Sequence, residues 1–212
     1  MTTIDTLGKI IGSAARVKLM RLFLFHPTHA FARDEIAKKT KITAATLRSE
    51  LSLLEKVDFI TKREITRVEI KKIKGRKKSI TRTSTRYSIN ADFSLLEPFS
   101  TLLLESDLVA VPELPTRFKS AGKMKLFVVS GVFMRDPNRS LDLLIVGDRL
   151  DNAAIQKSVG LLESEIGKEL RYAAFSVDEF QYRIKMYDKL IRDIFEFPHQ
   201  KLLNQITIPA GW

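Results

Sequence analysis

The chain has 212 residues, and its 36 Lys and Arg exceed its 25 Asp and Glu, which gives a net charge of +11. It has no cysteine, which excludes disulfides, thiolate metal sites and a cysteine nucleophile and favours a reducing compartment. No apolar run approaches the roughly 20 residues that span a bilayer, and the first residues lack a secretory pattern. We therefore expect a cytoplasmic protein without a membrane partner. The three histidines are too scattered for a metal site and are expected to be structural or exposed: His26, His29 and His199.

The excess positive charge is confined to one part of the chain. Residues 1–90 carry 21 basic and 8 acidic side chains, a net charge of +13, whereas residues 91–212 carry 15 and 17, a net charge of −2. This asymmetry predicts a polyanionic partner for the first part and a different role for the second.

Three helices are expected in the first part. Apolar spacing predicts one helix over 13–25, which Pro27 ends, and a second over 32–39. The basic residues of the first helix, Arg21 among them, are expected on its outside. Thr43 is a suitable N-cap for a third helix, because its hydroxyl can accept an unpaired amide hydrogen.

The third helix has two different faces. Leu47, Leu51 and Leu54 recur at helical spacing and form a stripe that we expect to be buried. The opposite side carries small, polar or basic side chains that suit contact with base edges and phosphates: Thr43, Ala45, Thr46, Arg48, Ser49 and Ser52.

A long basic β-ribbon is expected after these helices. Residues 59–70 and 82–89 alternate apolar and polar side chains, as strands do, around a basic tip at 74–78. Between residues 62 and 86 there are 11 basic and 2 acidic side chains, so the ribbon repels itself unless it is solvated or matched by phosphates. Its expected DNA contacts are Lys71, Lys72, Lys74, Arg76, Lys77, Lys78 and Arg82. The alternative is that the charge of the ribbon is only solvated and that the preceding helices form a helical hairpin that binds no DNA.

The segments 13–25 and 43–60 resemble the helices and strand entry of winged helix-turn-helix regulators of the ArsR/MarR type, and the resemblance covers about residues 10–90. It implies a recognition helix in the major groove and a wing against the DNA backbone or minor groove. Asp58 stands where a glycine is usual, at a position that Asp tolerates in the left-handed conformation. No cysteine or histidine matches the metal-sensing residues of such regulators, so no metal sensor is expected.

The middle of the chain is expected to connect two domains. A wide apolar stripe over 94–104 predicts a helix that packs on its own domain or pairs with its copy in a homodimer. The proline-bearing segment 111–115 is the expected boundary.

The last part alternates strands and helices, which predicts an α/β arrangement. Strands are expected over 125–130, 141–146 and 170–177, with helices over 152–166 and after a cap at Asp178.

The segments 129–133, 140–147 and 172–183 resemble the polymerase-β-like fold of minimal nucleotidyltransferases, and the resemblance covers about residues 118–205. That family uses a Gly-Ser pair and two acidic residues on the next strand to hold two magnesium ions. Gly131 and Asp142 match this motif, but Val132 replaces the serine and Ser140 the first acidic residue. We therefore expect a degenerate motif, with Asp142 as a hydrogen-bonding residue and with neither metal nor transfer activity.

Taken together, the sequence predicts an α+β protein. A winged helix-turn-helix domain with a long wing occupies 1–90, a linker with a possible dimerisation helix 91–116, and a nucleotidyltransferase-like domain 117–212. The expected function is a transcriptional regulator that binds double-stranded DNA as a homodimer and needs no cofactor. The alternatives are a nucleotidyltransferase guided by a winged helix, and a module that binds RNA or another protein.

Overall fold

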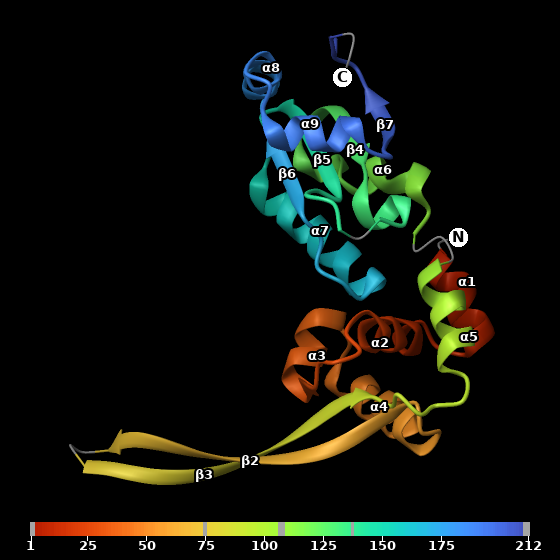
Figure 1. Ribbon diagram of the computed structural model, residues 1–212, viewed down its shortest axis with the longest axis vertical. Coiled ribbons are helices and arrows are strands. Elements are labelled where there is room, and N and C mark those ends of the chain that lie inside the picture. The colour runs from red at the N-terminus through yellow and green to blue at the C-terminus, as the bar shows by residue number, and fades with distance from the viewer. Residues whose placement is uncertain (1–2, 74–75, 106–108, 137, 210–212) are drawn as a thin grey trace. The chain divides into compact units, whose positions relative to one another are not determined.

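The computed structural model describes residues 3–73, 76–105, 109–136 and 138–209, and of Thr3, Glu105 and residues 67–82 the backbone alone. The chain folds as two compact units, residues 4–106 and residues 107–212. Each unit combines helices with one small sheet, so the predicted α+β class is confirmed (Figure 1). The division between the units lies inside the segment 91–116.

The first unit combines helices with a three-stranded antiparallel sheet of order β1-β3-β2. The helices predicted at 13–25 and 32–39 are present within a residue of those bounds. The first helix and the two-residue strand β1 were not predicted. The elements are α1 (Thr3–Ile11), α2 (Ala14–Phe25), β1 (Phe31–Ala32), α3 (Arg33–Thr40), α4 (Ala44–Lys56), β2 (Ile60–Ile73) and β3 (Arg76–Ile89).

Local side-chain chemistry sets several of these boundaries. Ser13 Oγ accepts a hydrogen bond from the amide of Arg16 at the start of α2, and Thr43 Oγ1 accepts one from the amide of Thr46 at the start of α4, as predicted. Asp58 has the left-handed φ of 59° expected at this turn.

The core of the first unit surrounds α2, which is buried along most of its length. The prediction that Arg21 lies outside is wrong. Its side chain is fully buried, and its Nε donates a hydrogen bond to the carbonyl oxygen of Leu103 at 3.1 Å. Because α2 has apolar residues on nearly all sides, its periodicity does not identify an exposed face.

The segment predicted as a helix over 94–104 forms α5 (Leu96–Ser100) and continues as the π-helical turn η1 (Thr101–Glu105). Its apolar stripe packs on the core of its own unit through Leu103 and, in part, through Phe93, Leu96, Phe99 and Leu104. Leu95 and Leu102 remain exposed.

The second unit contains a four-stranded sheet of order β6-β5-β4-β7, in which β5 and β6 are parallel and the other pairs antiparallel. The helix at 152–166 is confirmed, while the last helix and last strand were not predicted. The elements are η2 (Val111–Glu113), α6 (Leu114–Arg117), η3 (Lys119–Ala121), β4 (Lys123–Val129), η4 (Gly131–Met134), β5 (Leu143–Asp148), α7 (Asn152–Ile166), β6 (Tyr172–Phe175), α8 (Val177–Lys185), α9 (Lys189–Glu196) and β7 (Gln200–Asn204).

The two central strands of this sheet are buried on both faces. Leu126, Val128 and Leu144 pack in one cluster with residues of α8 and α9, and the alternate positions Phe127 and Val129 are fully buried as well. The predicted cap at Asp178 is wrong by two residues, because the hydroxyl of Ser176 accepts the amide hydrogen at the start of α8. In the described part of the chain no helix has the length and apolar character needed to cross a membrane.

Candidate nucleic-acid interface

The outer face of α4 consists of small, polar and basic side chains. Ala45, Arg48, Ser49 and Ser52 are exposed and recur at helical spacing, while the leucine stripe opposite them is buried. The structure thus brings the residues predicted on this helix together on one surface.

Hydrogen bonds within α4 hold the hydroxyl groups of this face. The Thr43 and Thr46 hydroxyls lie 3.0 Å apart, and the Ser49 hydroxyl donates to the carbonyl oxygen of Thr46 at 2.9 Å. Arg48 has no hydrogen-bond or ion-pair partner among the described residues. Its guanidinium is therefore free to donate to a ligand, and such donors recognise guanine or phosphate.

An ion pair that the sequence analysis missed fixes α4 from its buried side. Arg16 Nε donates to Glu50 Oε2 at 2.9 Å, and Arg16 Nη1 donates to the carbonyl oxygen of Ile11 at 2.7 Å. The side chains of Arg16 and Glu50 are only 22% and 11% exposed. A lone glutamate in a leucine stripe is the sequence signal that could have found this clamp between α4 and α2.

The strands β2 and β3 form a ribbon of 14 residue pairs that extends beyond the helices (Figure 1). At about 3.3 Å per residue the ribbon is roughly 45 Å long. The predicted contacts Lys71, Lys72, Arg76, Lys77, Lys78 and Arg82 have described backbones but undescribed side chains, and Lys74 lies outside the described residues.

The strand register divides the basic residues of the ribbon unequally. Because successive positions alternate between the faces of a strand, Arg63 and Arg86 share a face with the register positions of Arg67, Lys71, Arg76, Lys78 and Arg82. We call this the basic face. The other face has the register positions of Lys62, Glu64, Lys72 and Lys77 among apolar and hydroxyl residues, and Glu69 takes the one acidic register position on the basic face.

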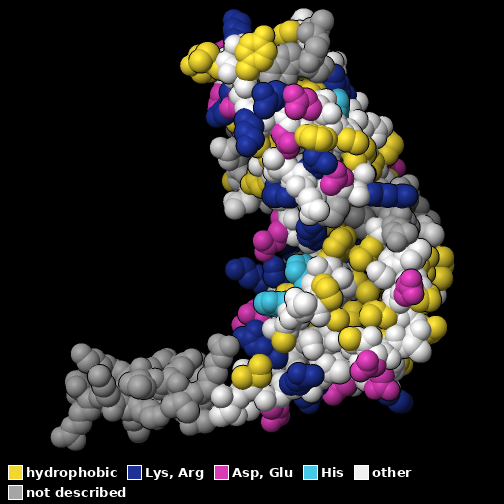
Figure 2. Space-filling view, in the orientation of Figure 1, with side chains coloured by type: hydrophobic (Ala, Val, Ile, Leu, Met, Phe, Trp, Pro, Cys, Tyr) yellow, Lys and Arg dark blue, Asp and Glu magenta, His cyan; other side chains and the backbone are white. Residues whose placement is uncertain are grey.

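The root of the ribbon is tied to α3. Arg86 Nη1 donates to Glu35 Oε2 at 3.0 Å and to the carbonyl oxygen of Ala30 at 2.9 Å, and Arg33 donates to the Tyr87 hydroxyl at 3.1 Å. Figure 2 shows Lys and Arg side chains gathered on the side of this unit from which the ribbon leaves.

In the second unit, the structure brings Gly131 and Asp142 together. The Asp142 side chain is buried, and its two oxygens accept hydrogen bonds from the amides of Val132 at 2.9 Å and Arg171 at 2.8 Å. Gly131 has a φ of +54°, and a Cβ there would lie 2.2 Å from Asp142 Oδ1. The carboxylate therefore joins η4 to the starts of β5 and β6, which is the hydrogen-bonding role expected of it.

The described side chains around this motif offer no cluster of three groups that could hold a metal ion. Ser140, where the nucleotidyltransferase resemblance leads us to expect an acidic residue, uses its amide to donate to Asp193 Oδ2 at 3.3 Å. Of the histidines, the ring of His26 lies 2.8 Å from the carbonyl oxygen of Leu22, and that of His199 lies 2.8 Å from the carbonyl oxygen of Phe197.

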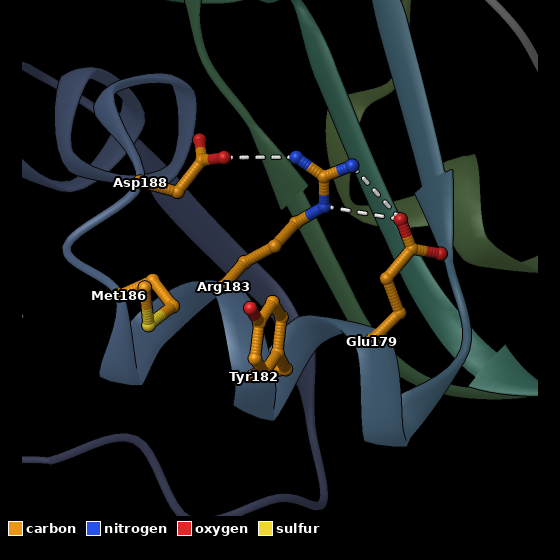
Figure 3. A pocket seen from close by; sticks show the side chains of 5 residues that line it. All are labelled: Glu179, Tyr182, Arg183, Met186 and Asp188. Carbon is orange, nitrogen blue, oxygen red and sulfur yellow. Dashed lines mark hydrogen bonds and ion pairs between the residues drawn. The ribbon is translucent and has the colours of Figure 1, made fainter.

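A hollow of about 420 Å³ on α8 was not predicted (Figure 3). Arg183 donates twice to Glu179 Oε1, at 2.9 and 3.0 Å, and once to Asp188 Oδ2 at 2.8 Å. These hydrogen bonds raise the pKa of Arg183, and the bond to Glu179 has the largest effect. Burial alone would raise the pKa of Asp188, but hydrogen bonds from the amide of Leu190 and from Arg183 lower it below the ordinary 3.8.

Comparisons of the chain with protein-family models, with curated proteins and with solved structures found no match in any of the three.

Proposed function

We propose that the protein is a DNA-binding transcriptional regulator whose first unit is a winged helix-turn-helix, with α4 as the recognition helix and the ribbon as the wing. From α2 onward, the order helix, strand, helix, helix, strand, strand and the sheet order β1-β3-β2 support this assignment. The observation that carries it is the exposed face of α4, where Arg48 has no partner in the described structure, beside a ribbon of net charge +9.

The two parts of this surface contribute differently to binding. Counterion release on phosphate contact gives affinity without sequence preference, and the charge of the ribbon suits that role. Base edges are distinguished by hydrogen bonds in the major groove, so sequence preference falls to Arg48, Ser49 and their neighbours on α4.

Binding of the full chain to labelled duplex DNA, selected from a random pool, tests the proposal. Arg48→Gln should alter the selected sequence, whereas Lys157→Gln, which removes an exposed helical cation from the second unit, should not. A pool that yields no enriched sequence, or a clear preference for RNA of the same length, would refute the proposal.

The register of the ribbon makes the wing assignment specific. Replacing Lys71 and Lys78 on the basic face with Gln should reduce the slope of log affinity against log salt by about 0.9 for each phosphate that the ribbon no longer neutralises. The same change at Lys72 and Lys77 on the other face should leave the slope unchanged. Equal slopes in the two variants would show that the basic face does not follow the phosphates.

A homodimer remains part of the proposal, since two-fold dimers are the commonest oligomers. Most of the apolar stripe of α5 and η1 packs within its own unit, so the exposed Leu95 and Leu102 are the leucines of this segment left to meet a second copy. A two-fold symmetric selected sequence would support the dimer, and sedimentation of Leu102→Lys as a monomer would place the contact at this segment.

We propose further that the second unit is a nucleotidyltransferase-like scaffold without transfer activity. All but one of the acidic positions of the motif are lost, and the remaining carboxylate of Asp142 is engaged by two amides. Incubation with magnesium and labelled nucleoside triphosphates tests this statement, because transfer that Asp142→Ala abolishes would overturn it.

A further inference from the structure

A cavity of about 370 Å³ lies at the root of the ribbon, entirely within the first unit. The loop 27–30 forms one wall, the first residues of β2 and the last of β3 form another, and residues 90–92 complete it. Its volume is within the range of small-molecule sites in proteins, at the lower end.

Two arginines line this cavity at directly opposed register positions, Arg63 and Arg86. Arg86 is compensated, since it donates to Glu35 at 3.0 Å and to the carbonyl oxygen of Ala30. Arg63 has no hydrogen-bond or ion-pair partner in the described part of the chain. Like charges directly opposed across a strand pair are destabilising, so the cavity contains an uncompensated cation with donors to spare.

A hydroxyl pair adds a further donor. Thr61 Oγ1 and Ser88 Oγ lie 3.0 Å apart and both line the cavity. Only one hydrogen is used between two hydroxyl groups that bond to each other, so one O–H remains to donate. The guanidinium of Arg63 has donors and no acceptor, so the unused groups of these two strands favour an acceptor-rich ligand.

The remaining lining limits the size and shape of that ligand. Pro27 and Ile65 give it an apolar part, and Asp92 is the one carboxylate among the lining residues. An anionic group is therefore expected to contact Arg63 rather than Asp92.

We propose that this cavity binds a small anion through a carboxylate or phosphate group that accepts hydrogen bonds from Arg63 and from the Thr61–Ser88 hydroxyl pair. The anion would then act at the junction of the loop 27–30 with both strands of the ribbon. This ligand site goes beyond the proposed DNA-binding function, and its test contains no DNA.

Isothermal titration of the full chain with citrate and, separately, with inorganic pyrophosphate tests the proposal and distinguishes carboxylate from phosphate recognition. Arg63→Gln should weaken binding of the preferred anion about tenfold or more, because charge-assisted hydrogen bonds are lost. Thr61→Val should weaken it about threefold. Lys62→Gln is the matched control, since it removes an exposed cation one residue away on the other face of the ribbon and should change affinity less than about twofold.

Two results would overturn the proposal. Equal weakening by Arg63→Gln and Lys62→Gln would show general attraction to a basic ribbon, and the absence of binding by both anions would show that the cavity is no anion site. Arg63 is exposed and without a partner among the described residues, so its replacement should leave the circular dichroism spectrum of the chain unchanged.

Discussion

The clamp between Arg16 and Glu50 determines how α4 is held, and its removal should loosen that helix. In Arg16→Met the long apolar side chain stays, but the Glu50 carboxylate, 11% exposed, loses the guanidinium that lies 2.9 Å from it. Removing one partner of a buried ion pair typically costs about 3–5 kcal/mol of folding stability, whereas an exposed pair contributes only about 0.2–1 kcal/mol. Because Arg16 is still 22% exposed, we expect an intermediate loss of about 2 kcal/mol.

Hydrogen exchange of the α4 amides in the full chain measures this loss locally, which matters because a chain of two units need not unfold in one transition. A loss of about 2 kcal/mol corresponds to exchange about 30-fold faster. Arg192→Met is the matched control. Arg192 Nε lies 3.4 Å from Glu196 Oε1, and the two side chains are 51% and 57% exposed. Because an exposed ion pair contributes little, the expected loss of stability is below about 0.5 kcal/mol.

The double variant Arg16→Met, Glu50→Leu separates the effect of the ion pair from that of the hydrogen bond between Arg16 and the carbonyl oxygen of Ile11, which both variants lack. Removing both charges should recover about 1 kcal/mol of the loss, because no uncompensated carboxylate remains among the leucines. If the double variant exchanges as fast as Arg16→Met, or if Arg16→Met exchanges as slowly as the unchanged protein, the clamp does not hold α4.

Three further predictions concern the second unit. Gly131→Ala should lower its thermal midpoint by on the order of 10 °C, followed by circular dichroism, because the new Cβ would meet Asp142 Oδ1 at 2.2 Å in a left-handed backbone. Asp142→Asn should destabilise the same unit by about 1–3 kcal/mol in urea unfolding, since its amide group cannot accept from both Val132 and Arg171. The lowered pKa of Asp188 adds stability that is present above its ordinary 3.8 and is lost as the pH falls through the lower folded value, so acid unfolding below about pH 4 should be less steep in Asp188→Asn than in the unchanged protein.

Local signals predicted the elements where the chemistry is local. The hydroxyl of Thr43 marks the start of α4, and Asp58 marks the left-handed turn before β2, because capping and backbone conformation depend on a few neighbouring residues. Gly131 and Asp142 were paired through a family motif, and the structure brings them together although no local pattern indicates how far apart they lie.

Other features depend on contacts between distant segments and left no local signal. The strand β1 has two residues and exists because Phe31 and Ala32 pair with β3, 54 to 56 positions later. Arg21 looks like a surface residue in sequence, yet it is buried with its Nε bound to Leu103, 82 positions away. Apolar periodicity carries no information about such pairings, which are set by the packing of the whole unit.

The register of the ribbon places like charges opposite one another, which its composition alone does not show. Cross-strand neighbours interact most strongly, and four of the 14 pairs join like charges at opposed positions. One, Arg63 with Arg86, lies at the root, and the other three lie beyond it: Arg67 with Arg82, Lys71 with Lys78, and Lys72 with Lys77. Each such pair is destabilising, and an isolated two-stranded ribbon is marginal in water. The arrangement therefore costs stability in the free protein. Under the proposed function, a phosphate backbone along the basic face would supply the opposite charge at the positions of Arg67 with Arg82 and of Lys71 with Lys78, whereas Lys72 and Lys77, on the other face, would depend on solvent.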